Sequence, residues 1–196
     1  MKINDRLIQI IEGSHERVKD YLDFMNKLSQ DPENYTLTRY SSIDEQRIIE
    51  RSKSWGKNII MMLAYDGSKV VGFFQASIGK YFNLESQFHV AEIAYAVDEE
   101  FRGKGLIYIL FNEAIKRLKD VRILTAWVDE RNLRSRNLLT KLGFREACKI
   151  DNFIYSQLEK IFCNLIMYVG DIEVVKTKLK EELTKKNITY VKNNLV

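Results

Sequence analysis

The feature that most constrains the fold is a strand, a glycine-containing loop and a helix in immediate succession. Residues 90–97 read as a strand, Arg102-Gly103-Lys104-Gly105 follows a short acidic turn, and residues 105–119 carry apolar side chains at helical spacing. A helix begins with backbone N–H groups that lack partners within it, and its dipole adds positive potential there. The segment therefore predicts a turn suited to phosphate. Taken alone, a tight turn with solvated basic side chains explains the loop equally well.

The rest of the chain predicts a mixed α/β domain. Strands are expected at residues 7–11, 58–65, 70–78, 90–97, 123–128, 146–150 and 160–169, and helices at 16–28, from 42 or 44 to 55, 105–119, 132–142 and 171–186, with a β-like tail at 188–191. Ser14 is the expected N-cap of the first helix. Gly67 lies in the turn of a hairpin, and Gly143 supplies the left-handed residue that ends a helix.

Composition excludes several classes of protein. The 196 residues carry a net charge of +4, with 45% hydrophobic and 30% charged residues, which is typical of a globular domain. No window holds the ~20 apolar residues of a membrane span, and the N-terminus has no signal-peptide pattern, so a cytoplasmic protein is expected. The sequence has no basic stripe with interleaved aromatic residues, which is the pattern that would indicate nucleic-acid binding. Cys148 and Cys163 show no metal-ligand spacing and are expected to be buried, inert thiols.

Further motifs follow the glycine loop. Asn132 stands after the next predicted strand, Ser135 comes three residues later, and the helix ends in Lys141-Leu142-Gly143-Phe144. Together with Arg102 and Gly105, these residues make the run from 90 to 144 resemble the GCN5-related N-acetyltransferase (GNAT) superfamily. The resemblance covers roughly residues 6–169, the expected N-acetyltransferase domain, and leaves 170–196 as a C-terminal extension. It implies a GNAT-like mixed, mostly antiparallel central sheet of about seven strands flanked by helices.

The resemblance also implies an acetyl-CoA site without a metal. The pyrophosphate would lie on the N–H groups of residues 103–108, the pantetheine arm would pair with the backbone of residues 95–97, and Asn132 would bind the arm from the other side. The residues expected to bind the co-substrate are Tyr95, Ala96, Val97, Arg102, Gly103, Lys104, Gly105, Leu106, Ile107, Tyr108, Asn132 and Ser135. Arg131, Arg134 and Arg136 are expected either to bind the 3′-phosphate of CoA or to form a solvated helix face.

Two positions depart from the family pattern. Ile107 stands where a glycine or alanine is usual, and its bulk would crowd or shift the pyrophosphate. Leu139 stands where many members carry the tyrosine that protonates the leaving thiolate. A leucine has no proton to donate, so another group or solvent would have to supply it.

Glu92 is the candidate general base. Strand alternation places it on one face with Val90, Ala94 and Ala96, where small side chains leave room for a substrate or a water. Many family members have a glutamate at this place. The alternative is a structural ion pair between Glu92 and a basic neighbour. His89 acting through water, Tyr95 and Tyr155 are weaker candidates.

The function implied is acetyl transfer from acetyl-CoA to a primary amine of a small molecule or peptide. The alternative is a catalytically weak acyl-CoA-binding or regulatory module with the same fold. Residues 29–42, 79–89 and 151–159 are expected to select the acceptor, although they hold no diagnostic motif. The last helix, with Val174, Val175, Leu179 and Leu183, packs either on the domain or on a second subunit of a homodimer.

Overall fold

The computed structural model describes residues 2, 3 and 5–186, and its framework is one sheet in the strand order β1-β2-β3-β4-β5-β6-β8-β7. The eight strands are β1 (Lys2–Ile3), β2 (Arg6–Glu12), β3 (Ile59–Asp66), β4 (Lys69–Ile78), β5 (Val90–Val97), β6 (Ile123–Asp129), β7 (Arg145–Ser156) and β8 (Ile161–Asp171). Only β5 and β6 pair in parallel. The mixed, mostly antiparallel sheet is confirmed, and β1 adds one strand to the seven expected.

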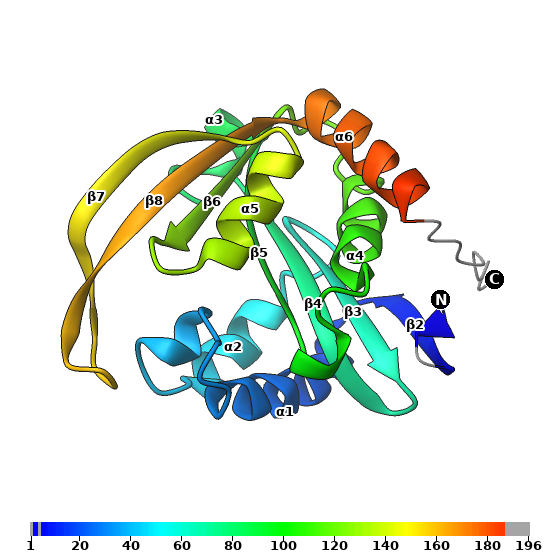
Figure 1. Ribbon diagram of the computed structural model, residues 1–196, viewed down its shortest axis with the longest axis horizontal. Coiled ribbons are helices and arrows are strands. Elements are labelled where there is room, and N and C mark those ends of the chain that lie inside the picture. Colours follow the sequence, from blue (N-terminus) through cyan, green and yellow to red (C-terminus); the bar gives the residue numbers. More distant parts are fainter. Residues whose placement is uncertain (1, 4, 187–196) are drawn as a thin grey trace.

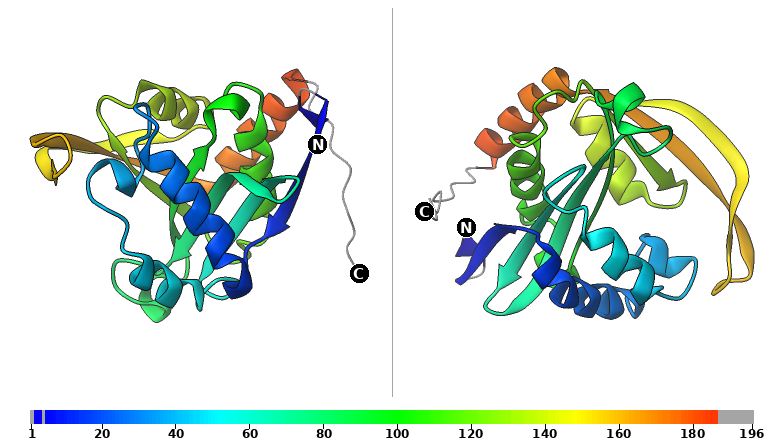
Figure 2. Two further views of the ribbon diagram at one scale, coloured as in Figure 1. Left: turned by 90° about the horizontal axis from the view of Figure 1, so that it is seen from below. Right: turned by 180° about the vertical axis from the view of Figure 1, so that it is seen from behind.

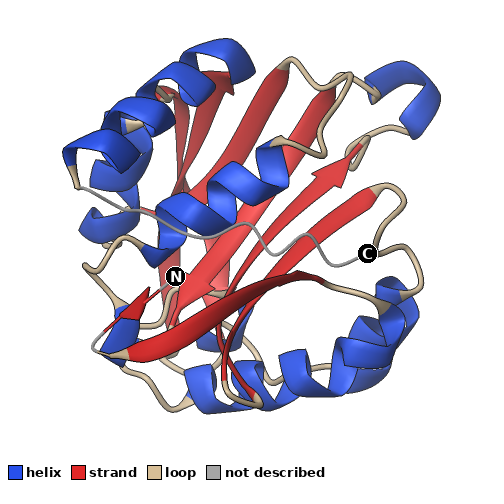
Figure 3. Ribbon diagram, turned by 90° about the vertical axis from the view of Figure 1, so that its right-hand side faces the viewer, coloured by secondary structure: helices blue, strands red, loops and turns tan. Residues whose placement is uncertain are grey.

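Helices cover both faces of the sheet (Figures 1 and 3). The helices are α1 (Val18–Ser29), α2 (Glu45–Ser52), α3 (Leu84–Gln87), α4 (Leu106–Ile115), α5 (Leu133–Lys141) and α6 (Ile172–Lys185), with short 3-10 turns η1 (His15–Arg17), η2 (Leu37–Arg39) and η3 (Glu99–Phe101). Alternate side chains of β3 face opposite sides, which is why nearly the whole strand is apolar. Met62 joins the larger core under α4 and α6, whereas Met61 joins a second core under α1.

The sheet is interrupted at its centre. β5 and β6 pair only where residues 90–92 lie beside residues 123–125, and beyond that point the two strands diverge (Figure 1). β5 stays paired with β4 along its whole length, and β6 stays paired with β8. The second half of β5 therefore has one edge paired to β4 and one edge open. An open edge of this kind can accept an extended, amide-bearing chain.

β7 and β8 form a long hairpin that projects from the rest of the molecule (Figure 2). The predicted strand at 146–150 is too short, because β7 continues through residues 151–156 and only 157–160 make the turn. β7 is the edge strand and is exposed on nearly all of its length. The prediction that Cys148 is buried is consequently wrong, since it lies on this edge strand, whereas Cys163 on β8 is buried as expected.

The helix ends agree with most of the sequence signals. Asp44 caps α2 by accepting a hydrogen bond from the Arg47 N–H at 2.9 Å, and Gly143 follows α5 with φ of +84°. Ser14 is wrong as a side-chain cap, because a 3-10 turn precedes α1 and the serine makes no capping hydrogen bond. The tail at 188–191 lies outside the described residues.

α6 packs on the domain. Ile172, Val175 and Leu179 are buried in the larger core, and Leu183 lies against it. The helix therefore shares its apolar face with α4 and the sheet. Among the described helices, none combines the length and the apolar character that a membrane crossing requires.

Candidate functional site

The loop before α4 presents a run of unpartnered N–H groups. Gly103 and Gly105 both adopt positive φ, at +73° and +84°, a conformation that glycine enters without strain. Within the described residues, the backbone N–H groups of 103–107 make no hydrogen bond. The Ile107 side chain packs against the larger core, so it lies away from the loop. Its backbone N–H is therefore one of the unpartnered N–H groups. Such a helix start is suited to a phosphate group.

The basic side chains of the loop already have partners in the protein. Arg102 pairs with Asp31 and donates from Nε to the Val97 carbonyl at 3.0 Å, and Lys104 donates to the Glu100 carbonyl. Asp31 comes from the segment after α1, so Arg102 ties that segment to the end of β5. The loop consequently offers its backbone N–H groups to a ligand more directly than its two cationic side chains.

The open edge of β5 lies beside this loop. The His89 carbonyl accepts hydrogen bonds from Arg122 and Ile123 on the β6 side, and backbone groups of every second residue point to the same edge of a strand. The N–H and C=O groups of residues 93 and 95 therefore face the divergence of the two strands. The Val97 carbonyl faces the same edge but is occupied by Arg102.

Three predicted co-substrate residues meet across the divergence. The Tyr95 hydroxyl lies 2.5 Å from Ser135 Oγ, which joins β5 to α5. Asn132 caps α5, since its side-chain oxygen accepts from the Ser135 N–H at 3.0 Å, and its amide NH₂ is left as a donor. Burial raises the pKa of Tyr95, so its hydroxyl stays protonated. Leu139 is fully buried in the larger core and offers no proton donor.

Glu92 lies where β5 and β6 begin to diverge. Its carboxylate accepts hydrogen bonds from the Lys80 ammonium and from the Tyr81 hydroxyl, which both come from the connection between β4 and β5. Tyr81 in turn accepts a hydrogen bond from Trp127 Nε1 at 2.8 Å. Burial, and then the hydrogen bond to Glu92, raises the pKa of Tyr81 to about 12. Glu92 therefore forms an ion pair with a basic neighbour, which was the alternative to its role as general base.

The weaker candidates for the base lie in other surroundings. The His89 ring packs edge-on against Phe88, with 5.3 Å between the ring centroids. Tyr155 packs on Phe162 within the β7–β8 hairpin, with centroids 5.0 Å apart. Neither contact involves Glu92.

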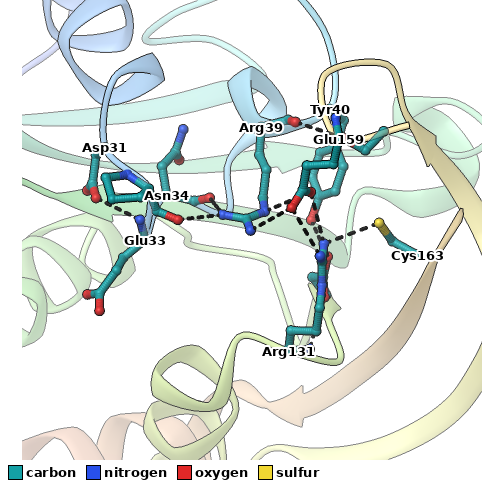
Figure 4. A network of polar contacts seen from close by, with 11 residues as sticks. Asp31, Glu33, Asn34, Arg39, Tyr40, Arg131, Glu159 and Cys163 are labelled. Atoms are coloured by element: carbon teal, nitrogen blue, oxygen red, sulfur yellow. Dashed lines mark hydrogen bonds and ion pairs between the residues drawn. The ribbon is translucent and has the colours of Figure 1, made fainter. Parts of the chain in front are cut away.

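A partly buried polar network holds the tip of the β7–β8 hairpin against the segment before α2 (Figure 4). Asp129, at the end of β6, accepts from Arg131 at 2.7 Å and from the Tyr40 hydroxyl at 3.0 Å. Glu159, in the hairpin turn, pairs with Arg39 at 2.9 Å and with Arg131 at 3.3 Å. The network ties together segments 29–42 and 151–159, two of the three that were expected to select the acceptor.

The arginines in α5 and just before it form ion pairs within the protein. Besides its contacts in the network, Arg131 lies 3.2 Å from the Cys163 sulfur. Arg134 pairs with Glu33 at 2.7 Å, and Arg136 pairs with Glu146 at 3.3 Å. In the part of the chain that the structure describes, no cluster of three or more His, Cys, Asp or Glu could hold a metal ion.

Sequence reasoning did not single out four residues that contact Glu92 directly or through one another. They are Lys80, Tyr81, Trp127 and Phe153, and they come from the β4–β5 connection, β6 and β7. Segments 79–89 and 151–159 were expected to shape the acceptor site, but nothing in the sequence marks which of their residues face it. In the structure Thr125 lies in register with Glu92, and Trp127 shares the strand face of Thr125, a pairing of strands that the sequence does not reveal.

Comparisons with known proteins match this chain to one family and to one fold. The model of the acetyltransferase (GNAT) family matches residues 22–144. A GNAT-family acetyltransferase from Streptococcus pneumoniae superposes with a TM-score of 0.71 at 18% identity, covering 84% of this chain and 99% of that one. An N-acetyltransferase from Staphylococcus aureus Mu50 gives 0.70 at 22% identity, covering 85% and 99%. At these identities the likeness is one of fold.

A putative acetyltransferase from Salmonella typhimurium, whose structure includes its cofactor acetyl-CoA, also shares the fold. It gives a TM-score of 0.70 at 13% identity, covering 85% of this chain and 94% of that one. No curated protein matches the chain in sequence.

Proposed function

Because the chain belongs to the acetyltransferase (GNAT) family, we propose that it transfers the acetyl group of acetyl-CoA directly to a primary amine of a small molecule or peptide. The observation that carries the proposal is the divergence of β5 and β6, which leaves an open strand edge between the N-terminus of α4 and Glu92. The family match and a structural relative that holds acetyl-CoA support it.

The residues present fit acetyl-CoA. The N–H groups of residues 103–107 would bind the pyrophosphate, and the backbone of residues 93 and 95 would pair with the amides of the pantetheine arm. Asn132 would donate its amide NH₂ to the arm from the α5 side. In this arrangement the thioester would lie toward the point where the strands separate, beside Glu92.

Glu92 would act as the general base. A primary amine has a pKa of about 10.4 and is mostly charged at neutral pH, so it must lose a proton before it can attack. Glu92 takes that proton, directly or through water, and the nitrogen lone pair forms a bond to the thioester carbonyl carbon. The nitrogen releases its second proton to solvent as the carbon–sulfur bond breaks and the amide forms, and CoA leaves as a thiolate that takes a proton from solvent, because Leu139 has none to give.

The second candidate function is an acyl-CoA-binding module of low activity. Leu139 favours it, and so does the internal ion pair between Lys80 and Glu92. In that case acetyl-CoA would bind without turnover. Binding and turnover must therefore be measured separately.

Binding is tested by thermal unfolding with acetyl-CoA. At 100 times its dissociation constant the ligand should stabilise the protein by about 2.7 kcal/mol, which raises the Tm by several degrees. Gly103→Ala should reduce this shift, because a side chain at φ +73° strains the loop. Gly56→Ala is the matched control, since Gly56 has a similar φ of +78° and open space around it, as Gly103 has, but lies outside the site. An unchanged Tm in the wild type contradicts both candidate functions.

Turnover is tested by thiol release with a panel of amines between pH 6 and 10. Glu92→Gln should lower kcat/KM by about 10²- to 10⁴-fold at low pH. The deficit should shrink toward the amine pKa, where neutral amine is abundant. Glu85→Gln, an exposed carboxylate on α3, should leave the profile unchanged. A pH profile that is the same in Glu92→Gln and the wild type removes Glu92 from this role.

A further inference from the structure

The sheet face toward α1 and α2 is uncovered at one central position. Ala94 lies in the middle of β5 and is nevertheless exposed, whereas its neighbour Ile93 on the other face is buried in the larger core. Glu92 and Ala96 share the face of Ala94, and Ala96 lies against the core under α1. Gln75 of β4 stands directly opposite Ala94. A small molecule can thus reach the middle of the sheet beside Glu92.

A primary ammonium already occupies the Glu92 carboxylate. Lys80 Nζ forms an ion pair with Glu92 and lies 5.9 Å from the centroid of the Tyr81 ring, within the range of a cation–π contact. The Lys80 side chain is 40% exposed, whereas that of Glu92 is 12% exposed. Because the Lys80 side chain remains in contact with solvent, it can leave Glu92 when a second ammonium takes its place, and the carboxylate stays paired.

Tyr81, which contacts the same carboxylate, belongs to a group of partly exposed aromatic rings. We call Tyr81, Trp127 and Phe153 the aromatic surface. Trp127 donates to the Tyr81 hydroxyl at 2.8 Å and stacks on Phe153, with centroids 5.1 Å apart and an angle of 14° between the rings. Tyr81 is 42% and Phe153 51% exposed, although they come from different parts of the chain. Aromatic faces that gather beside a charged group are suited to a flat apolar ligand group.

We infer that the acceptor is an arylalkylamine, whose ammonium replaces Lys80 Nζ on Glu92 and whose flat ring packs on the aromatic surface; this inference rests on the proposed function. The Tyr81 hydroxyl contacts both Glu92 and Trp127, so a single oxygen separates the carboxylate from the indole. The amine and the ring of the acceptor are therefore joined by a short alkyl stem. An acceptor without a ring leaves the aromatic surface exposed to water.

The first test compares three amines that share a primary ammonium. 2-Phenylethylamine has a flat ring, 2-cyclohexylethylamine has a ring that is not flat, and n-butylamine has none. Thiol release with saturating acetyl-CoA should give a KM about three- to tenfold lower for 2-phenylethylamine than for either of the others, the range expected of one aromatic contact. Mass spectrometry of the product should show one added acetyl group on the amine.

The second test changes the aromatic surface. Phe153→Ala should raise the KM for 2-phenylethylamine about three- to tenfold and leave that for n-butylamine unchanged. Phe162→Ala is the matched control, because Phe162 is 64% exposed on the same hairpin but packs on Tyr155. If Phe153→Ala does not fold, Phe153→Leu keeps much of the volume and removes the flat ring. Equal effects of the Phe153 and Phe162 variants overturn the inference.

The third test frees the carboxylate. Lys80→Met should lower the KM for 2-phenylethylamine, because the internal competitor is gone, while the acetyl-CoA dissociation constant stays unchanged. Acetylation of Lys80 itself, detected by peptide mass spectrometry without added amine, would make Lys80 the acceptor and overturn the inference.

The outcomes separate this inference from the proposed function. Thiol release at equal kcat/KM for all three amines overturns the inference and leaves the amine acetyltransferase intact. Acetyl-CoA binding with no acetylation of 2-phenylethylamine also overturns it. No thermal shift with acetyl-CoA and no thiol release would contradict the proposed function, and the inference with it.

Discussion

At the scale of single residues, Asp129 is a buried carboxylate that several side chains hold in place. It is buried at the end of β6, and burial by itself would raise its pKa. The hydrogen bonds from Arg131 and Tyr40 outweigh that effect, so the pKa of Asp129 lies below its ordinary value. The ionised carboxylate thus holds the segment before α2, the end of β6 and the hairpin turn together.

Asp129→Asn should destabilise the protein by about 1.5–3 kcal/mol at pH 7, because it removes the charged hydrogen bonds to Arg131, whose side chain is 35% exposed and keeps Glu159 as a partner. A lowered pKa in the folded state means that this stabilisation is complete above the ordinary pKa of about 3.9 and is lost as the pH falls through the lower folded value. Urea unfolding of wild type and variant should therefore differ by a constant amount from pH 5 to 8, and the difference should shrink below pH 4.

Asp151→Asn is the control for this prediction. Asp151 is an exposed carboxylate paired with Lys149 on the hairpin, and its loss should change the free energy of unfolding by less than about 1 kcal/mol. A wild type and an Asp129→Asn variant of equal stability at pH 7 would mean that the network is not a source of stability.

The partners in this network could not be predicted from the sequence. Asp129 and Arg131 are two residues apart, but their partners Tyr40 and Glu159 are 89 and 28 positions away from them. Periodicity and motif spacing carry no information about which distant side chains meet. The glycine loop could be singled out as a candidate because its residues are contiguous, whereas Lys80, Trp127 and Phe153 come from three separate parts of the chain that no local pattern connects.

At the scale of elements, the end of α5 is fixed by α6. Gly143 has φ of +84°, and a Cβ built there would lie 2.7 Å from Val174 Cγ1. Gly143→Ala should destabilise the protein by about 1–2 kcal/mol through backbone strain, with about 1–3 kcal/mol more from the contact, since valine is stiff at χ1. Gly56→Ala, at φ +78° with nothing within 4 Å, should show the strain alone. Chemical denaturation of the two variants measures the difference.

A double-mutant cycle locates the contact. Val174→Ala in the Gly143→Ala background should recover most of the excess over Gly56→Ala, because the clashing methyl group is removed. Additive effects of the two substitutions would contradict a direct contact between the ends of α5 and α6.

Elements were predictable where a strong local pattern coincides with burial. β5 was placed at its observed bounds, and α5 was placed to within a residue, because both have alternating or helical apolar patterns and clear ends. β7 was too short because an exposed edge strand has no buried face to impose alternation, and its length is set by pairing with β8. The same reason explains why Cys148 is exposed.

At the scale of the whole molecule, one sheet separates two hydrophobic cores. The larger core contains α4 and α6, and the second contains α1 with Trp55. Strands such as β3 contribute to both, so neither core can lose its packing without exposing the other face of the same strands. We therefore expect cooperative unfolding of all described elements, including α6, in a single transition.

Leu179→Ala tests that expectation. Leu179 is 1% exposed in the larger core, and its truncation should cost about 2–5 kcal/mol, which lowers the Tm by several degrees. Val174→Ala, on the 45% exposed side of the same helix, should cost less than about 1 kcal/mol. Circular dichroism at 222 nm reports the helices, and fluorescence reports Trp55 and Trp127, which both lie on the opposite face of the sheet. If α6 is one unit with the sheet, both signals shift by the same amount in Leu179→Ala. A shift in circular dichroism without a shift in fluorescence would instead make residues after 170 a separately folding extension.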